Sequence, residues 1–307
     1  MAGVPISHSD RVVFPQIGAT KLDVAQYYET IGSWILPHVR DRPLTLVRCP
    51  TGAGTAAAPG ECFFVKHSKV WAPAPIRRVR IREKTKVGEY LIADSVAAVV
   101  GLVQIGVLEI HTWNSCFANV ERPDRIVIDL DPGERVAWPA VVESARLVRR
   151  MLAAVDLESF VKTTGGRGLH VVVPLAPRAD WSACLEFARA VADTLTASDP
   201  ERYTARFTKS GREAQILVDY LRNNRTNTSI AAYSTRAKPA APVSVPLAWH
   251  ELSARRPPDR WTMTAVLKRL AALSDDPWRG YRALTGRSGQ LLPRVRFDRA
   301  LRSRGLS

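Results

Sequence analysis

Two carboxylates lie two residues apart in the apolar stretch 125–133, RIVIDLDPG. Side chains of a strand alternate between its faces, so Asp129 and Asp131 would share one face, with their Cα atoms about 6.5 Å apart. At that distance their oxygens can converge on one divalent cation, which would also offset the repulsion between the two charges. We expect the opposite face to be buried and the aspartate face to be open. A solvated strand end that runs into a turn at Pro132 and Gly133 is the simpler alternative.

A third aspartate lies on another apolar stretch, AQILVDYLRNNRTNTS at residues 214–229. Period-two alternation places Leu217 and Asp219 on one face of a strand there. Three strand-borne aspartates in a basic protein fit phosphoryl or nucleotidyl transfer by two metal ions, which activate a hydroxyl and stabilise the departing pyrophosphate.

A glycine-rich segment, TTGGRGLH at residues 163–170, could bind the phosphates of such a substrate. Its glycines let backbone N–H groups approach phosphate oxygens, and Thr164, Arg167 and His170 add further donors. Without the neighbouring carboxylates, a plain hairpin turn is the favoured explanation of the glycines. A histidine at a strand edge, such as His111 or His170, is also commonly a core residue.

Composition indicates a folded protein with a polyanionic partner. Of its 307 residues 46% are hydrophobic, and 44 Lys and Arg against 29 Asp and Glu give a net charge of +15, which favours nucleic acid. The apolar run 96–108 is too short to cross a bilayer, so we expect no membrane partner. The N-terminus lacks the pattern of a signal peptide, which predicts a cytoplasmic protein.

The four cysteines, Cys49, Cys62, Cys116 and Cys184, are far apart and form no CxxC pair. This spacing argues against structural zinc and against a disulfide framework. We predict four buried, reduced thiols.

Strands and helices alternate without a regular βαβ rhythm, which predicts an α/β fold of the α+β type with a mixed sheet flanked by helices. The first helix is expected to begin after Thr20 and end before Pro37, and the second to be capped by Asp94. Helices are expected at residues 22–36, 96–106, 138–152, 181–195 and 262–273. Strands are expected at residues 12–14, 44–50, 61–67, 107–113, 125–131, 159–163, 169–175 and 216–220, the second and third as a hairpin.

Two further segments are basic. Residues 66–86 contain eight Lys and Arg against one acid, and prolines there exclude a long helix. Such a run either contacts phosphates or forms a solvated face. Residues 294–304 are rich in arginine.

The ordered motifs VRCP, ECFFVKH, LEIHTW, VIDLDPGE, TTGGRGLH, VDYLRNNRTNTS and AAYSTRA resemble the polymerase domain of bacterial DNA ligase D, in the archaeo-eukaryotic primase superfamily. The resemblance covers nearly the whole chain. It implies primase-polymerase-like mixed and antiparallel sheets in one catalytic domain over residues 1–307. The expected parts are an N-terminal part to about residue 90, a core over about 91–290 and a basic tail over 291–307.

The resemblance also implies template-directed and end-directed addition of NTP or dNTP to the 3′-hydroxyl of DNA at gaps and double-strand breaks, with ribonucleotides favoured. This is the chemistry of bacterial non-homologous end joining, with Mn²⁺ or Mg²⁺ in a two-metal site. The implied partners are Ku and a ligase domain or ATP-dependent DNA ligase, in a nucleoid-associated protein. Alternatives are a replicative primase and a non-catalytic module that bridges DNA ends. The DxD motif also occurs in glycosyltransferases that bind nucleotide sugars, but such an enzyme fits neither the net charge of +15 nor the third aspartate.

The resemblance assigns roles residue by residue. The metal-binding and catalytic positions are Asp129, Asp131 and Asp219. The nucleotide-binding positions are Arg48, Lys66, His111, Thr164, Arg167, His170, Arg222 and Arg236, with Phe63 or Phe64 stacking on a base. The positions that bind the 5′-phosphate of a DNA gap are Arg11 and Lys21. Thr164 stands where the family commonly has Ser, Arg167 where it commonly has Lys, and Arg11 where some members have Lys.

Overall fold

The computed structural model describes residues 1–67, 71–208, 210–293, 297 and 299. Most of the predicted basic tail, including residues 300–307, lies outside the described residues. The chain divides into two compact units, each made of three stretches of sequence. Unit 1 comprises Met1–Ala118, Thr228–Val245 and Arg260–Leu273, and unit 2 comprises Asn119–Asn227, Pro246–Asp259 and Ser274–Ser307. The expected single domain with parts divided near residues 90 and 290 stays a prediction.

Unit 1 contains an antiparallel four-stranded sheet. Its strand order is β13 (Ser229–Ile230), β7 (Val107–Thr112), β3 (Leu44–Arg48) and β4 (Phe63–Val65). Strands β3 and β4 pair antiparallel, which confirms the predicted hairpin.

The α-helices among the described residues of unit 1 are α1 (Lys21–Thr30), α2 (Gly32–Val39), α3 (Val96–Gln104) and α6 (Met263–Ala272). Thr20 and Asp23 form the capping box at the start of α1, as predicted. The single helix over residues 22–36 is wrong, because the chain leaves helical geometry at Ile31. A Cβ on Gly32 would lie 2.5 Å from the Val96 side chain, so glycine permits the close approach of α3. Helix α2 also continues past Pro37.

Ser95, and not Asp94, caps α3. The Ser95 hydroxyl accepts from the backbone N–H of Ala98 at 3.1 Å, because Ser95 directly precedes the first helical residue. The Asp94 carboxylate instead accepts from the N–H of Asp41 at 2.6 Å and pairs with Arg77 at 3.0 Å.

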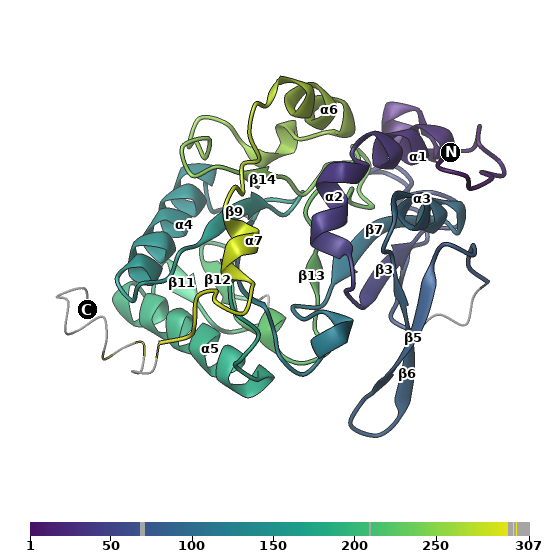
Figure 1. Cartoon of the computed structure of the whole chain (residues 1–307). Coiled ribbons are helices and arrows are strands. Elements are labelled where there is room, and N and C mark those ends of the chain that lie inside the picture. The colour runs from purple at the N-terminus through teal and green to yellow at the C-terminus, as the bar shows by residue number, and fades with distance from the viewer. Residues whose placement is uncertain (68–70, 209, 294–296, 298, 300–307) are drawn as a thin grey trace. The chain divides into compact units, whose positions relative to one another are not determined.

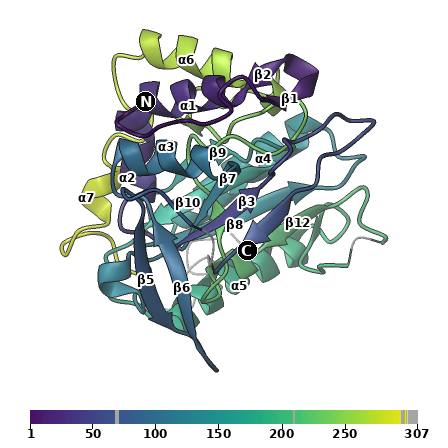
Figure 2. The same ribbon diagram turned by 90° about the vertical axis from the view of Figure 1, so that its right-hand side faces the viewer.

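Residues 77–82 of the basic run form one strand of a hairpin in unit 1, shown in Figure 2. Its strands are β5 (Arg77–Arg82) and β6 (Val87–Ile92). Val79 and Ile81 are buried in β5, whereas its four arginines are exposed. The remaining small elements of this unit are β1 (Val12–Phe14), β2 (Ala19–Thr20) and the 3₁₀ helix η1 (Pro15–Ile17), and η2 (Phe117–Asn119) lies where unit 1 ends.

Cys49 and Cys62 form a disulfide, which corrects the prediction of four reduced thiols. The register of the hairpin explains it: Arg48 lies opposite Phe63, so the next residues along each strand, Cys49 and Cys62, face each other with Cα atoms 4.3 Å apart. The spacing rule missed this pair because it considered neighbours in sequence only. Cys116 and Cys184 are free thiols, of which Cys184 is buried.

We expect Cys49→Ser to lower the free energy of unfolding by about 3 kcal/mol, since the disulfide closes a short loop. Urea titrations should show this loss under oxidising conditions and no difference from the parent with a dithiol reductant. Cys116→Ser is the matched control. Alkylation of the denatured, unreduced parent should modify two of its four cysteines; modification of all four would contradict the disulfide.

Unit 2 contains a mixed six-stranded sheet, in agreement with the predicted fold class. Its strand order is β11 (Tyr203–Thr204), β12 (Ile216–Asp219), β8 (Arg125–Pro132), β10 (Leu169–Pro174), β9 (Phe160–Thr163) and β14 (Pro246–Leu247). Only β11 and β12 run parallel among these described strands. Helices α4 (Trp138–Ala153) and α5 (Trp181–Ser198) lie against this sheet in Figure 1, and α7 (Tyr281–Leu284) crosses in front of it. The 3₁₀ helix η3 (Leu221–Asn223) also belongs to this unit, and η4 (Pro258–Arg260) lies at its boundary in sequence with unit 1.

Both faces of β8 are covered along most of its length. Ile128 on one face is fully buried. On the aspartate face, Val127 packs in a core cluster with Phe160, Trp278 and Tyr281. The prediction of an open aspartate face is therefore wrong except at its end, because the segment that contains α7 buries this face.

No helix in the described ranges is long and apolar enough to span a membrane.

Candidate active site: a carboxylate centre and a basic strand surface

A row of ionisable side chains crosses four neighbouring strands of unit 2. Asp129 on β8 lies opposite both Asp219 on β12 and His170 on β10, and His170 lies opposite Lys162 on β9. Residues that pair across strands place their side chains on the same face. All four are at least nine-tenths buried. We call Asp129, Asp131 and Asp219 the carboxylate centre.

Arg222 connects two members of the carboxylate centre. Its Nε lies 3.0 Å from an oxygen of Asp129 and 3.0 Å from an oxygen of Asp219. Arg222 occupies this position because η3 begins two residues after Asp219 and turns the chain back toward β8. The guanidinium thus compensates two buried negative charges at once.

Asp131 is the exposed member. Its side chain is 53% exposed, and the guanidinium of Arg212 lies 3.6 Å from one of its oxygens. Burial and the charge of Asp129 raise the pKa of Asp131. The carboxylate centre therefore has two buried members and one that faces solvent at the end of β8.

His170 is uncharged at neutral pH. Burial, followed by the charge of Lys162, lowers the pKa of His170 to about 4, although its Nε2 lies 3.4 Å from Asp129. Burial alone would raise the pKa of Asp129, but its polar neighbours lower it overall. The contacts with His170 and with Arg222 both lower the pKa of Asp129.

The donor set suits a hard divalent cation, for which carboxylate oxygens are preferred ligands. Within the described residues, no three His, Cys, Asp or Glu side chains are gathered closely enough to hold a metal ion. One oxygen of Asp129 and one of Asp219 each lie 3.0 Å from Nε of Arg222, so the guanidinium occupies the place between the two carboxylates. The residues therefore fit a divalent cation by the chemistry of their donors, and a cation bound to both carboxylates would have to displace this guanidinium.

The glycine-rich segment packs directly against the carboxylate strand. A Cβ on Gly168 would lie 2.5 Å from the carbonyl oxygen of Leu130, so only glycine permits this approach. The Thr164 hydroxyl accepts from the N–H of Gly166 at 3.2 Å and donates to the carbonyl of Gly168 at 3.2 Å. The segment is a tight hairpin turn between β9 and β10, beside the carboxylate centre.

Arg167 is turned toward the backbone that follows β8. One Nη atom donates to the carbonyls of Gly133, Glu134 and Val136 at 2.8 to 3.1 Å. Arg167 therefore braces the turn after the carboxylate strand, a contact that the sequence did not predict.

Asn223 is a structural residue that sequence reasoning missed. Its amide accepts from the backbone N–H of Val127 at 2.8 Å and donates to the Val127 carbonyl at 2.8 Å. β12 begins at Ile216 opposite Pro132 and ends at Asp219 opposite Asp129, so Asn223 replaces the missing strand partner at Val127. The double asparagine after Asp219 was the available signal.

In unit 1, aromatic and basic side chains gather on β3, β4 and β7. Arg48 lies over the ring of Phe63 at 6.0 Å, and the ring of Phe64 lies 5.7 Å from that of His111. The exposed fractions of Phe63 and Phe64 are 40% and 69%. Exposed aromatic rings beside cations suit base stacking. These four residues, with Arg236, form what we call the basic strand surface.

Glu109 links two members of the basic strand surface and was also missed. One oxygen lies 2.8 Å from Nε2 of His111 and the other 2.9 Å from Nε of Arg236. Burial alone would raise the pKa of Glu109, but the hydrogen bond from His111 and the charge of Arg236 lower it to about 2. The alternation of LEIHTW, which puts Glu109 and His111 on one face, was a usable signal.

This pKa predicts a pH-dependent contribution to stability. Because the folded-state pKa of about 2 lies below the ordinary 4.5, the stabilisation is full above about pH 4.5 and is lost as the pH falls toward 2. Glu109→Gln keeps one hydrogen bond and should lower the free energy of unfolding by about 2 kcal/mol at pH 7. Urea titrations should show the gap to the parent narrow at pH 3.5; a constant gap would contradict the ion pair.

Arg11 and Lys21 lie together in unit 1, as the 5′-phosphate assignment requires. The N–H of Lys21 donates to the carbonyl of Arg11 at 2.8 Å, and burial, then the charge of Arg11, lower the pKa of Lys21. The Lys21 ammonium contacts the carbonyls of Ser7 and Gln104 and the Gln104 side chain at 2.8 to 2.9 Å. Lys21 thus holds local structure, whereas Arg11 is exposed.

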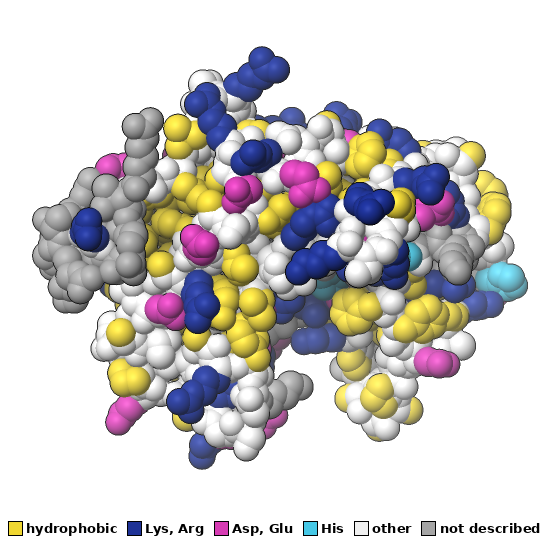
Figure 3. Space-filling model, turned by 90° about the horizontal axis from the view of Figure 1, so that it is seen from below, with side chains coloured by type: hydrophobic (Ala, Val, Ile, Leu, Met, Phe, Trp, Pro, Cys, Tyr) yellow, Lys and Arg dark blue, Asp and Glu magenta, His cyan; other side chains and the backbone are white. Residues whose placement is uncertain are grey.

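Lys66 directly follows β4, and its ammonium group lies 3.8 Å from a carboxylate oxygen of Glu83. Lys and Arg side chains are widely exposed on the face seen in Figure 3.

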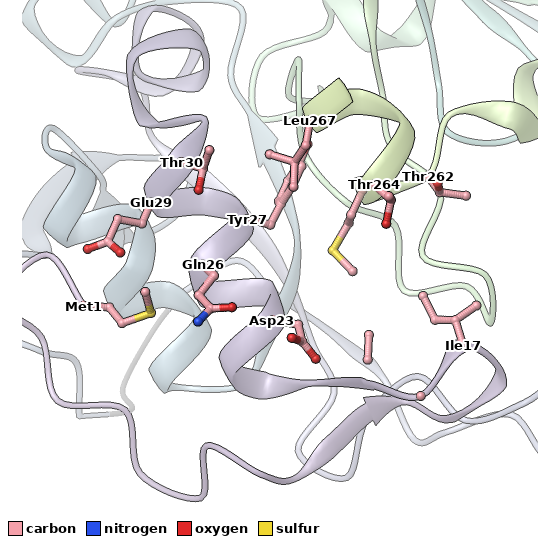
Figure 4. Close-up of a pocket in the computed structure, with 13 residues that line it drawn as sticks. Met1, Ile17, Asp23, Gln26, Tyr27, Glu29, Thr30, Thr262, Thr264 and Leu267 are labelled. Carbon is pink, nitrogen blue, oxygen red and sulfur yellow. The ribbon is translucent and has the colours of Figure 1, made fainter. Parts of the chain in front are cut away.

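A separate cavity of about 780 Å³ lies in unit 1, where Asp23 and Gln26 of α1 face Thr264 and Leu267 of α6 (Figure 4). No predicted site residue lines it, and Asp23 is engaged in its capping box.

The family profile described as LigD, primase-polymerase domain, matches residues 20–278. The chain belongs to this family. The primase-polymerase fold that the resemblance implied is confirmed by a solved structure, the polymerase domain from Mycobacterium tuberculosis ligase D in complex with DNA. The TM-score is 0.83 at 31% identity, with 92% of this chain and 99% of that chain covered.

LigD proteins are similar in sequence over this domain. The chain is 40% identical over 281 residues to the multifunctional non-homologous end joining protein LigD of Pseudomonas aeruginosa, covering 91% of this chain and 33% of that protein. It is 34% identical over 252 residues to LigD of Mycolicibacterium smegmatis, covering 81% and 32%. The chain spans about a third of the length of these LigD relatives.

Proposed function

We propose that the chain transfers nucleotides from NTP or dNTP to the 3′-hydroxyl of DNA, at gaps and double-strand breaks, in bacterial non-homologous end joining. The observation that carries the proposal is the pairing of Asp129 with Asp219 across two strands, with Asp131 two residues along β8. Membership of the LigD primase-polymerase family supports a nucleotidyltransferase. The DNA in the M. tuberculosis structure supports DNA as the substrate.

The carboxylate centre would hold two Mn²⁺ or Mg²⁺ ions. When bound, they would activate the attacking 3′-hydroxyl and neutralise charge on the triphosphate. In the absence of these ions, Arg222 compensates the negative charges of Asp129 and Asp219. With the ions bound, Arg222 would be released from both carboxylates and could donate to phosphate oxygens. His170, neutral and buried beside Asp129, would position that carboxylate.

The remaining assignments concern substrate binding. In unit 2, Thr164, Arg167 and His170 would bind the triphosphate. In unit 1, the basic strand surface and Lys66 would bind the nucleotide, with ribonucleotides favoured and Phe63 or Phe64 stacking on a base. Arg11, supported by Lys21, would bind the 5′-phosphate of a gap. Ku and a ligase domain or ATP-dependent ligase are the proposed partners.

Arg167 distinguishes substrate binding from a purely structural role. We expect Arg167→Lys to keep kcat/KM within about tenfold of the parent, because an ammonium still donates to phosphate while adjacent glycines supply backbone donors, whereas Arg167→Ala loses clearly more. Steady-state extension rates against NTP concentration check this. If Arg167 only braces the turn, Ala will lower the melting temperature and leave the KM for NTP unchanged.

The proposed function is tested with gapped, 5′-phosphorylated DNA, Mn²⁺ and labelled ATP. Extension of the primer is the expected result. A replicative primase would instead label products on a template without a primer. A non-catalytic bridging module would join DNA ends in a pull-down and give no labelled product; either outcome would overturn the proposal.

A further inference from the structure

An exposed phenylalanine lies in a basic segment of unit 2 that no assignment above uses. Phe207 follows β11 and is 40% exposed, and its neighbours Arg206 and Thr208 are also exposed. The described residues of unit 2 include one other exposed large hydrophobic side chain, Leu291. Phe207 is thus an isolated aromatic side chain among polar ones.

A second ring and a cation support Phe207 from behind. Its ring lies 5.7 Å from that of Tyr220 at an interplanar angle of 69°, and the guanidinium of Arg189 on α5 lies 5.9 Å from the Tyr220 ring. Tyr220 directly follows Asp219 of the carboxylate centre. We call Phe207, Tyr220 and Arg189 the aromatic platform.

A positively charged cavity of about 490 Å³ lies along the same segment. Arg206 and Arg212 line it together with the hydroxyl side chains of Thr208 and Ser210, and no Asp or Glu is among its described lining residues. The Arg206 guanidinium and these hydroxyl groups suit phosphate, whereas the Arg212 guanidinium also lies 3.6 Å from Asp131. Arg206 and Thr208 line this cavity, whereas Phe207 between them does not.

We infer that the aromatic platform stacks on a base of the single-stranded DNA segment whose backbone phosphate enters this cavity. The inference deepens the proposed function and rests on it, because it names the part of the DNA that this surface binds. A strand that crosses Arg206 and Phe207 would meet a ring for its base and a guanidinium for its phosphate. Stacking on a ring is tolerant of sequence, as an enzyme acting at arbitrary breaks requires.

A protein partner fits this surface less well. A stable protein interface buries about 800 Å² on each partner and has an apolar core. One exposed phenylalanine flanked by Arg189 and Arg206 offers no such core, whereas stacked rings and cations are what single-stranded nucleic acid binds.

The test measures the affinity of the full chain for a fluorescein-labelled 12-nucleotide single strand by anisotropy. Loss of one stacked base corresponds to roughly 5- to 150-fold weaker binding, which we expect for Phe207→Ala. Phe207→Trp keeps a ring and should bind within about twofold of the parent. Leu291→Ala, an exposed apolar substitution in the same unit, should change nothing. A 2-aminopurine in the strand should be quenched by the parent and not by Phe207→Ala.

Equal affinity and equal quenching for Phe207→Ala and the parent would overturn the inference, as would a variant that changed only the oligomeric state in sedimentation. Thermal melts show whether each variant is folded. Extension of gapped DNA by the parent tests the proposed function separately. A parent that extends DNA while Phe207→Ala binds normally would refute the platform alone, and a parent that binds strands without extending them would refute the proposed activity alone.

Discussion

Asp129→Ala is expected to lower the rate of primer extension by more than about 1000-fold, roughly 4 kcal/mol of transition-state stabilisation. Asp129 belongs to the carboxylate centre and lies opposite Asp219 on one neighbouring strand and opposite His170 on the other. Its removal takes away a ligand of the proposed metals and leaves Arg222 with one carboxylate. Single-turnover incorporation of labelled ATP on gapped DNA measures the loss.

DNA affinity separates this effect from misfolding. Phosphate contacts by Lys and Arg supply most of the affinity for DNA, so Asp129→Ala should bind the gapped substrate as tightly as the parent. Asp275→Ala is the matched control, because Asp275 is an exposed aspartate of unit 2 whose carboxylate lies 3.8 Å from the exposed guanidinium of Arg279. Loss of binding together with activity would point to a structural role for Asp129.

Asn223→Ala is expected to lower the free energy of unfolding by about 4 kcal/mol, since it leaves the buried N–H and carbonyl of Val127 without partners. The side-chain amide contacts both groups at 2.8 Å and also donates to the carbonyl of Tyr220 at 2.9 Å. Urea titrations of the parent and the variant measure the difference.

The neighbouring residue supplies the control. Asn224 is exposed, so Asn224→Ala should change stability by less than about 0.5 kcal/mol. If Asn223→Ala and Asn224→Ala unfold alike, the side chain of Asn223 does not act as a strand partner. Because Asn223 ends the turn that places Arg222, its loss should also reduce extension.

Alternation of apolar and polar residues predicted strands β8 and β12, but it could not predict that they pair with Asp129 opposite Asp219. It could not show that the aspartate face is covered, because Trp278 and Tyr281 come from a segment distant in sequence. The position of Arg222 between two carboxylates was likewise invisible, since it depends on the turn at η3.

Local rules failed where packing between elements decides the outcome. The break before Gly32 follows from the approach of α3, and the Cys49–Cys62 disulfide follows from the register of the β3–β4 hairpin. Glu109 was missed because a carboxylate in an apolar strand was assigned no role. Its partner His111 is two residues away on the same strand face, whereas its other partner, Arg236, comes from a segment distant in sequence.

The metal stoichiometry of the carboxylate centre can be measured directly, by electron paramagnetic resonance titration of Mn²⁺ with gapped DNA and a non-hydrolysable NTP analogue present. The parent is expected to bind two ions per chain, as a two-metal centre requires. Asp129→Ala and Asp219→Ala should bind fewer, and Asp275→Ala should match the parent. A parent that binds no Mn²⁺, or aspartate variants that bind as many ions as the parent, would contradict a metal centre formed by Asp129, Asp131 and Asp219.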